Sequence, residues 1–246
     1  MKKILTILSV TRIFVLFSFT IKAQDAYEQP KSYLTFLAGV SSPMGDFKLA
    51  DYYNNKAGFA KVGPTFGFDG AIFVYKNWSI GYNFTYQDQS ELTQNDANAL
   101  SAGFNSDFNK NTTTVTTVDR YESLNFMAGP QYTFTRGKFF IDVRASAGVL
   151  KSIATPSYGV NFDYSTNPYT VITQFSSSSL PFAYGASAAL RYSFSDAWDV
   201  SIKENFINTT GIKIEYNDDP GTIGRFQTRQ PVALLQTTIG ITLRFL

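Results

Sequence analysis

From Ser32 onward, large apolar side chains and small or polar side chains take turns along the sequence. In the segment 78–86 every even position is aromatic or isoleucine, and every odd position is serine, glycine, asparagine or threonine. The segment 235–245 repeats the pattern with the parity reversed. Successive side chains of a β-strand point to opposite faces, so a period of two predicts strands with one apolar and one polar face.

Eight such segments follow one another, and their spacing predicts how they are arranged. They cover residues 32–41, 60–75, 78–88, 119–135, 138–151, 182–194, 198–207 and 231–246. Three connections are tight turns and four are long, and the two kinds alternate strictly. This alternation is typical of outer-membrane barrels, with turns in the periplasm and loops outside the cell. We therefore predict an all-β fold: an eight-stranded antiparallel up-and-down transmembrane β-barrel with four long extracellular loops and three short periplasmic turns.

The side-chain types predict which face of the sheet meets lipid. Aromatic residues make up 16 % of the chain and charged residues only 16 %, whereas soluble domains carry about 25 % charged residues. The interior of an eight-stranded barrel is just wide enough for side chains to fill it. Phe and Tyr on every strand would overfill that interior, so the aromatic face is expected to point outward. The alternative, an aromatic sandwich core, does not explain the alternating turns.

The opposite face is expected to line the barrel interior and carries most of the charges of the strands. The predicted polar network of this lumen consists of Asp69, Asp142, Arg144, Arg191, Lys203 and Arg244. Buried charges persist when they are paired and hydrogen-bonded, which favours a closed, plugged barrel. The alternative is a narrow conduit whose selectivity these charges set.

Aromatic residues next to the tight turns predict a girdle at the membrane interface. Both tryptophans of the chain stand directly after a turn. The predicted girdle consists of Trp78, Trp198, Tyr132, Phe194 and Phe245.

The N-terminal segment predicts export. Lys2 and Lys3 precede the apolar stretch Ile13–Ile21, and the small residue Ala23 follows it. This is the order of a signal peptide, and a membrane-spanning helix would need about 20 apolar residues. We expect a signal peptide at 1–23, a short periplasmic segment at 24–31 and the barrel at 32–246. Outside 1–23, 17 basic residues face 19 acidic ones, so the charge favours no nucleic-acid partner.

Three stretches resemble the small outer-membrane β-barrel domain family common in Bacteroidota, often called porin-like or PorT-type. They are Gly39–Phe47, Ala128–Tyr132 and Gly240–Phe245. The architecture also resembles the transmembrane domain of OmpA-type proteins. The last stretch is similar to the signal read by the barrel-assembly machinery, which the resemblance implies as a partner during biogenesis. No activity follows from these motifs, because they are structural.

The sequence gives little support for catalysis, a metal site or a cofactor. The chain has no His and no Cys, which removes every Ser–His or Asp–His arrangement and the usual zinc ligands. A carboxylate-only site would draw on Asp51, Asp88, Asp119 and Glu122, but rim carboxylates are more often solvated or bridged by cations. We therefore expect no enzyme activity and no cofactor.

The long loops are where a specific function is expected. The third loop contains the candidate partner-binding residues Tyr158, Phe162, Tyr164 and Tyr169. The alternative is that these aromatics pack on one another as a cap or extend strands above the membrane. In the second loop, 91–102 is compatible with a helix whose apolar stripe contains Leu92, Ala99, Leu100 and Ala102. In the fourth, Asp218–Gly221 predicts a turn.

Two functions remain open. The first is a non-enzymatic envelope protein of a Gram-negative-type outer membrane, either structural or an accessory subunit, that binds partners through its loops or lipid face. The second is a small passive channel for ions or small solutes. Outer-membrane lipid and lipopolysaccharide are the expected surroundings, and a larger outer-membrane complex is the expected partner in the first case.

Overall fold

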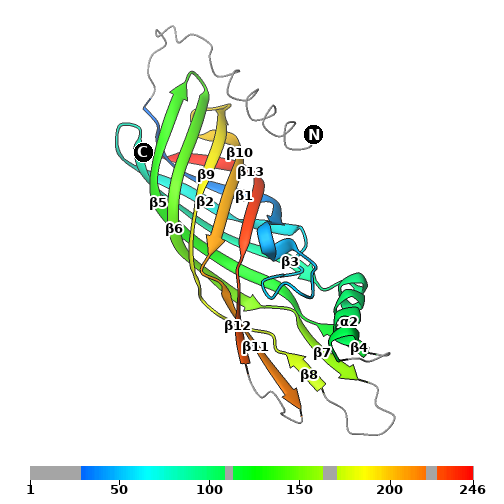
Figure 1. Ribbon diagram of the computed structural model, residues 1–246. Helices are drawn as coiled ribbons and strands as arrows, with labels where there is room; N and C mark the ends of the chain where they lie inside the picture. Colours follow the sequence, from blue (N-terminus) through cyan, green and yellow to red (C-terminus); the bar gives the residue numbers. More distant parts are fainter. Residues whose placement is uncertain (1–28, 109–112, 163–170, 220–225, 246) are drawn as a thin grey trace, which may run out of the picture.

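The computed structural model describes residues 29–108, 113–162, 171–219 and 226–245. Eight antiparallel strands close into a barrel in the order β1-β13-β10-β9-β6-β5-β3-β2, as Figure 1 shows. They are β1 (Ser32–Pro43), β2 (Gly63–Tyr75), β3 (Trp78–Glu91), β5 (Arg120–Arg136), β6 (Phe139–Ala154), β9 (Phe182–Ser193), β10 (Trp198–Thr209) and β13 (Ala233–Phe245). The predicted eight-stranded antiparallel barrel is confirmed, and every strand bound lies within three residues of its predicted position.

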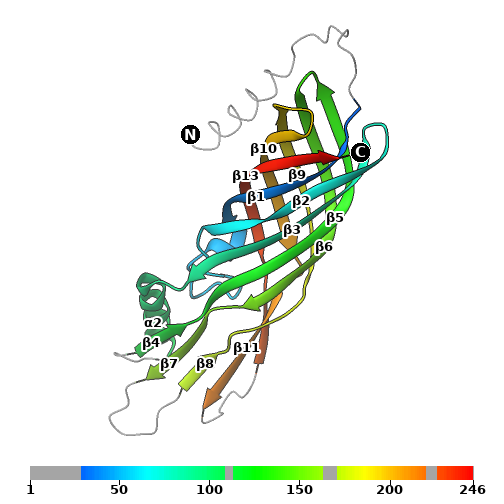
Figure 2. The ribbon, with the colours of Figure 1, turned by 180° about the vertical axis from the view of Figure 1, so that it is seen from behind.

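The tight turns gather at one end of the barrel, which we call the turn end. The connections β2–β3, β5–β6 and β9–β10 lie there, together with the first residue of β1, which pairs with the last residue of β13. Gly137 closes the β5–β6 turn at a φ of 55°, a left-handed conformation that glycine adopts without steric cost. The opposite end, where the long connections leave the barrel, is the loop end (Figure 2).

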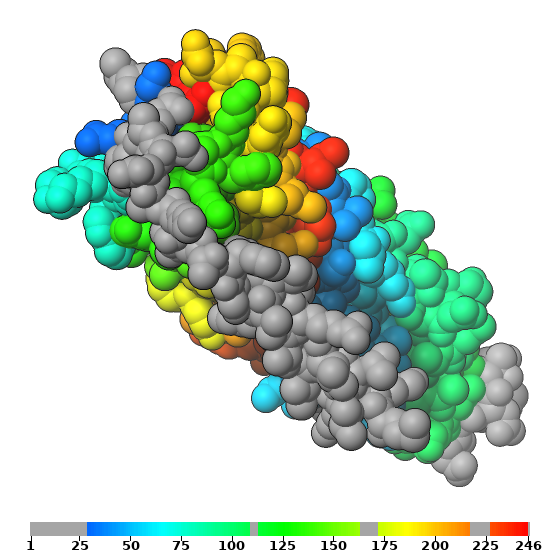
Figure 3. All heavy atoms as spheres, turned by 90° about the horizontal axis from the view of Figure 1, so that it is seen from above, coloured from blue at the N-terminus to red at the C-terminus, as the bar shows by residue number. Residues whose placement is uncertain are grey.

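The long connections fold into structure of their own beyond the loop end. A second sheet has the order β12-β11-β8-β7-β4, and we call it the loop sheet. Its strands are β4 (Thr113–Val118), β7 (Ser157–Phe162), β8 (Val171–Gln174), β11 (Ile212–Asp219) and β12 (Phe226–Gln230). The helix α2 (Gln94–Phe108) and the 3-10 turn η1 (Gly45–Lys48) complete this region. The molecule is consequently elongated, with α2 at the tip away from the turns (Figure 3).

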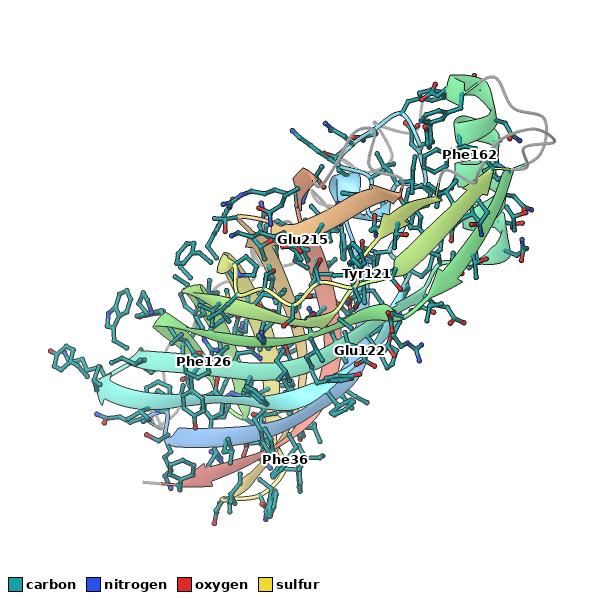
Figure 4. The ribbon with its side chains drawn as sticks, turned by 90° about the horizontal axis from the view of Figure 1, so that it is seen from below. Phe36, Tyr121, Glu122, Phe126, Phe162 and Glu215 are labelled. Carbon is teal, nitrogen blue, oxygen red and sulfur yellow. The ribbon has the colours of Figure 1, made fainter. Side chains whose placement is uncertain are left out.

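The two faces of the barrel wall differ as the alternation predicts. Phe36 and Phe126 point away from the wall, as Figure 4 shows, and both are more than half exposed. The same face carries other exposed apolar side chains on the remaining strands: Phe66, Ile80, Val143, Leu190, Ile202 and Ile239. The predicted outward direction of the apolar face is therefore confirmed.

Two predicted segments lie wholly or partly outside the described residues. The signal peptide at 1–23 and Pro220–Gly221 of the predicted turn lie outside the described residues. The described part of that turn, Asp218 and Asp219, belongs to β11. No helix among the described residues has the length and apolar character needed to cross a membrane.

Candidate functional site in the barrel interior and at the loop end

Asp199 organises the charges nearest the turn end of the barrel interior. Its carboxylate lies 2.8 Å from Nη1 of Arg191 and 3.0 Å from Nε of Arg244. Arg191 also contacts Asp142, with 2.7 Å between Nε and Oδ2. The Arg191 guanidinium sits over the ring of Tyr33, at 3.9 Å from the ring centroid. This stacking and the two ion pairs hold the guanidinium plane between three strands and the facing ring.

A second group of charges lies around Asp69. The carboxylate receives two hydrogen bonds from Arg144, at 2.8 and 3.2 Å, and a further one from the ammonium of Lys203. Gln131 accepts two more bonds from Arg144, at 3.0 and 2.6 Å. Gly81 makes room for this arrangement, because a Cβ there would lie 2.1 Å from Arg144 Nε.

These two groups bring all six predicted lumen residues together in one buried network. Its three carboxylates face four cations, a formal charge of +1, and no member is more than 6 % exposed. The sequence pattern did not lead us to one acidic member, Asp199, or to two inward-pointing aromatic residues, Tyr33 and Phe140. Asp199 shares its parity with Lys203, so the alternation contained the signal. Whether the network sets a function stays a prediction.

Further toward the loop end the interior contains neutral amides and apolar side chains at overlapping levels. Gln87, Asn125 and Gln236 join their side chains by hydrogen bonds of 2.8 and 2.5 Å. Beside them lies an apolar cluster, the apolar plug, formed by Met127, Leu150, Ile207 and Leu234 from four strands, with Phe47 of η1 packed in the same cluster. The interior face is therefore not uniformly polar, which is a correction to the sequence-based picture.

The five girdle residues all point outward at the turn end. Trp78 packs on Tyr132 with ring centroids 5.0 Å apart, and its register partner across the turn is Tyr75. Trp198, Phe194 and Phe245 are each at least 40 % exposed. The structure thus gathers them at one level of the wall, and their position at a lipid interface stays a prediction.

The described aromatics of the third loop are turned inward. Phe162 is 1 % exposed and packs in a second apolar cluster with Phe104 of α2, and Tyr158 packs against that cluster. Figure 4 shows Phe162 beside the helix. These two side chains therefore lie in the interior of the region formed by the loop sheet and α2, and they are not exposed contacts. This arrangement agrees with the alternative in which the loop aromatics pack on one another and extend the strands. Tyr164 and Tyr169 lie outside the described residues.

The helix of the second loop runs from Gln94, three residues later than predicted, and its buried face differs in part. Leu92 and Leu100 are buried as part of the second cluster, but Ala102 is exposed. Its buried stripe contains Ala97, Leu100 and Phe104 instead. Sequence reasoning missed Phe104 because the predicted helix ended at 102.

The rim carboxylates do not converge on one site. Asp88 pairs with Arg120 at 3.2 Å, and Asp119 accepts a hydrogen bond from Ser157 at 2.9 Å. Within the described ranges, no group of three or more carboxylates is placed to hold a metal ion.

Comparisons with known proteins give structural likeness only. No protein-family model and no curated protein matches the sequence. Neisserial surface protein A (NspA) aligns with a TM-score of 0.46 at 8 % identity, over 89 % of this chain and 100 % of that one. A major outer-membrane protein from Thermus thermophilus aligns at 0.48 and 9 %, over 87 % and 99 %. Ail from Yersinia pestis aligns at 0.44 and 9 %, over 89 % and 100 %. The strand pairing itself, and not these likenesses, defines the barrel.

Proposed function

We propose that this chain is an integral outer-membrane protein without enzyme activity. It conducts no ions and acts through the loop sheet and α2, which together we call the loop-end extension. The apolar outer face of the barrel supports the membrane location, because a closed barrel satisfies every backbone group internally and can face lipid. The turn end then lies in the periplasm and the loop end outside the cell. Membership of the porin-like or PorT-type family is part of this proposal.

The filled interior is the observation that carries the proposal. Charges occupy the turn end of the lumen, and paired amides and the apolar plug fill it further toward the loop end. An ion crossing this path would have to separate buried ion pairs and pass the side chains of the apolar plug, both of which are costly. A structural or accessory role fits this interior better than transport does.

The loop-end extension supplies the surface for such a role. The loop sheet and α2 stand beyond the loop end, where the long connections of a surface barrel carry binding functions. A larger outer-membrane complex is the partner we propose, with lipid and lipopolysaccharide around the barrel. Gly240–Phe245 would be read by the barrel-assembly machinery during insertion.

One observation favours the alternative of a small passive channel. Ser79 Oγ, Asn83 Oδ1 and Ser201 Oγ are buried and have no hydrogen-bond partner among the described residues. Polar groups of this kind can line a path for water or small ions.

Planar-bilayer recording separates the two functions. We expect the purified chain to insert without conductance steps, and a variant with both Leu150→Ser and Ile207→Ser to conduct, because it removes part of the apolar plug. Folding of both proteins is checked by heat-modifiable migration in detergent gels. Steady conductance by the folded wild-type protein would support the channel and contradict our proposal.

Co-purification from gently solubilised membranes tests the accessory role directly. We expect a partner to be retained in stoichiometric amounts. Recovery of the barrel alone under conditions that preserve other outer-membrane complexes would leave the accessory role without support.

A further inference from the structure

A carboxylate stands on the outer face of the barrel, halfway along a strand. Glu204 lies six residues after Trp198 on β10, has the same outward parity, and is exposed. Strands rise about 3.4 Å per residue and tilt by about 45° in such barrels, so six residues correspond to about 14 Å along the barrel axis. The apolar band of an outer-membrane barrel is about 25 Å tall. Glu204 therefore lies near the middle of this band and not at its edge.

The outward-facing cations of the wall lie close to strand ends. Arg120 and Arg136 are the first and last residues of β5, and Lys151 is three residues from the end of β6. A charged side chain at the height of Glu204 is costly in lipid. The barrel offsets this cost only in part, because the one side-chain hydrogen bond to the carboxylate among the described residues comes from the hydroxyl of Thr237, at 3.0 Å.

Four exposed alanines on β6 and β9 lie beside Glu204 at nearly the same height. Ala188 is the register partner of Glu204 on β9, and Ala186, next on the same face, pairs with Ala145 of β6. Ala147 follows on the outer face of β6. We call this part of the wall the alanine face, and it consists of Ala145, Ala147, Ala186, Ala188, Glu204 and Thr237.

The opposite side of the barrel is bulky at this height. β3 lies four strands from β10 in either direction around the barrel, and Phe84 follows Trp78 by six residues, just as Glu204 follows Trp198. The register partner of Phe84 on β2 is Phe68, whose ring lies 4.9 Å from that of Phe36 between centroids. Lipid chains alone would surround both sides alike and give no reason for this difference. Small side chains at membrane depth allow another backbone to approach closely.

We propose that the alanine face docks a membrane-embedded segment of a second, different protein, and that this segment places a lysine or arginine against Glu204. The inference deepens the accessory role proposed above and rests on the membrane location. Charge complementarity selects the occupant, because a cation would convert a costly single carboxylate into an ion pair. A second copy of this chain fits less well. A symmetric contact would set two Glu204 carboxylates against each other, and the outward cations of the described strands are at other heights.

The probe for the test is a synthetic transmembrane helix of leucine and alanine with one central lysine. The same helix with leucine in place of the lysine is its reference. The full-length mature protein is reconstituted in phospholipid vesicles, and energy transfer from its tryptophans to a dye on the helix reports binding. We expect saturable binding of the lysine helix, about three- to thirtyfold tighter than that of the leucine helix, which is the range for polar contacts between membrane segments.

Two matched variants locate the preference for lysine. In Glu204→Leu this preference should vanish while heat-modifiable migration persists. Glu122→Leu removes a carboxylate near the loop end of β5 and should keep the preference. A double variant with Ala145→Phe and Ala186→Phe makes this side as bulky as the opposite one, so both helices should bind more weakly to a barrel that still folds.

Three results would contradict the inference, and they differ in what else they affect. Equal binding of the two helices by the inserted wild type, or a lysine preference that survives in Glu204→Leu, would overturn it and leave the membrane location intact. Self-association of the wild type that is lost in Glu204→Leu would assign the alanine face to a second copy. A chain that does not enter the vesicles would contradict the membrane location itself.

Discussion

At the turn end, Asp199 pairs with two guanidinium groups, whereas Asp142 pairs with one. Asp199 is fully buried and contacts two guanidinium groups, those of Arg191 and Arg244. Neutralising it would leave two carboxylates in the lumen network against four cations. Charges buried at this depth are tolerated because each has an opposite charge within hydrogen-bond distance.

The substitution Asp199→Asn is expected to destabilise the folded barrel by about 3 kcal/mol, because it keeps the shape and removes the compensating charge. Urea unfolding in lipid vesicles measures the change. Asp196→Asn, in the exposed β9–β10 turn nearby, is the matched control and should change stability by less than about 0.5 kcal/mol. Equal stability of the two variants would show that the Asp199 ion pairs contribute little.

Trp78 and Trp198 allow the predicted girdle to be tested at the same scale. They are the two tryptophans of the chain, and both point outward at the turn end. In the single-tryptophan variants Trp78→Phe and Trp198→Phe, we expect stronger fluorescence quenching by lipids brominated near the headgroup than by lipids brominated near the acyl-chain ends, because tryptophan prefers the interface. The opposite order for either residue would place it in the middle of the bilayer.

At the scale of elements, the barrel strands could be predicted and the loop sheet could not. In β3, aromatic and small side chains alternate because one face points outward and the other into the lumen, so the period of two is visible. In β4 the sequence is Thr-Thr-Val-Thr-Thr-Val, which favours a strand but contains no period of two. Its partner β7 lies about 40 residues away, and pairing between distant loops leaves no local signal.

The start of α2 is an element whose stability should depend on pH. Thr93 and Asp96 form a capping box, in which Thr93 N–H donates to the Asp96 carboxylate at 2.8 Å and Asp96 N–H donates to Thr93 Oγ1 at 3.3 Å. Lys61 also contacts Asp96 at 2.8 Å. Burial alone would raise the pKa of Asp96, but the hydrogen bonds from Lys61 and Thr93 outweigh it and lower this pKa below its usual value.

A lowered pKa means that the capping box stabilises α2 above the unfolded-state pKa, near 4, and that this contribution is lost as the pH falls through the folded value. We expect the hydrogen-exchange protection of the α2 amides, corrected for intrinsic rates, to be constant from pH 7 to 5 and to fall below about pH 4. Asp96→Asn should show weaker protection at pH 7 and little further loss on acidification. An unchanged α2 in this variant would mean that packing of Leu100 and Phe104 suffices.

For the whole molecule, the sequence predicts the closed barrel and the burial of its charges, because both follow from parity and connection length. It does not predict the apolar plug or the cavity between the long connections. Met127 and Leu150 have inward parity, but the apolar cluster that they form also contains Phe47 from the first connection, which the sequence pattern does not place. That cavity is lined by residues of all four long connections, so no single segment of the sequence indicates it.

The orientation of the whole molecule gives the last prediction. The chain contains no cysteine, so a single introduced cysteine can be labelled without background. Thr114 in β4 of the loop sheet and Asp196 in the β9–β10 turn are both exposed, and they mark the two ends of the molecule. In intact cells, a membrane-impermeant maleimide should label Thr114→Cys and leave Asp196→Cys unlabelled, because only the loop end is expected to face outward. After the outer membrane is permeabilised, both variants should react equally, which controls for intrinsic reactivity. Labelling of Asp196→Cys alone in intact cells would reverse the orientation and place the loop sheet and the helix in the periplasm.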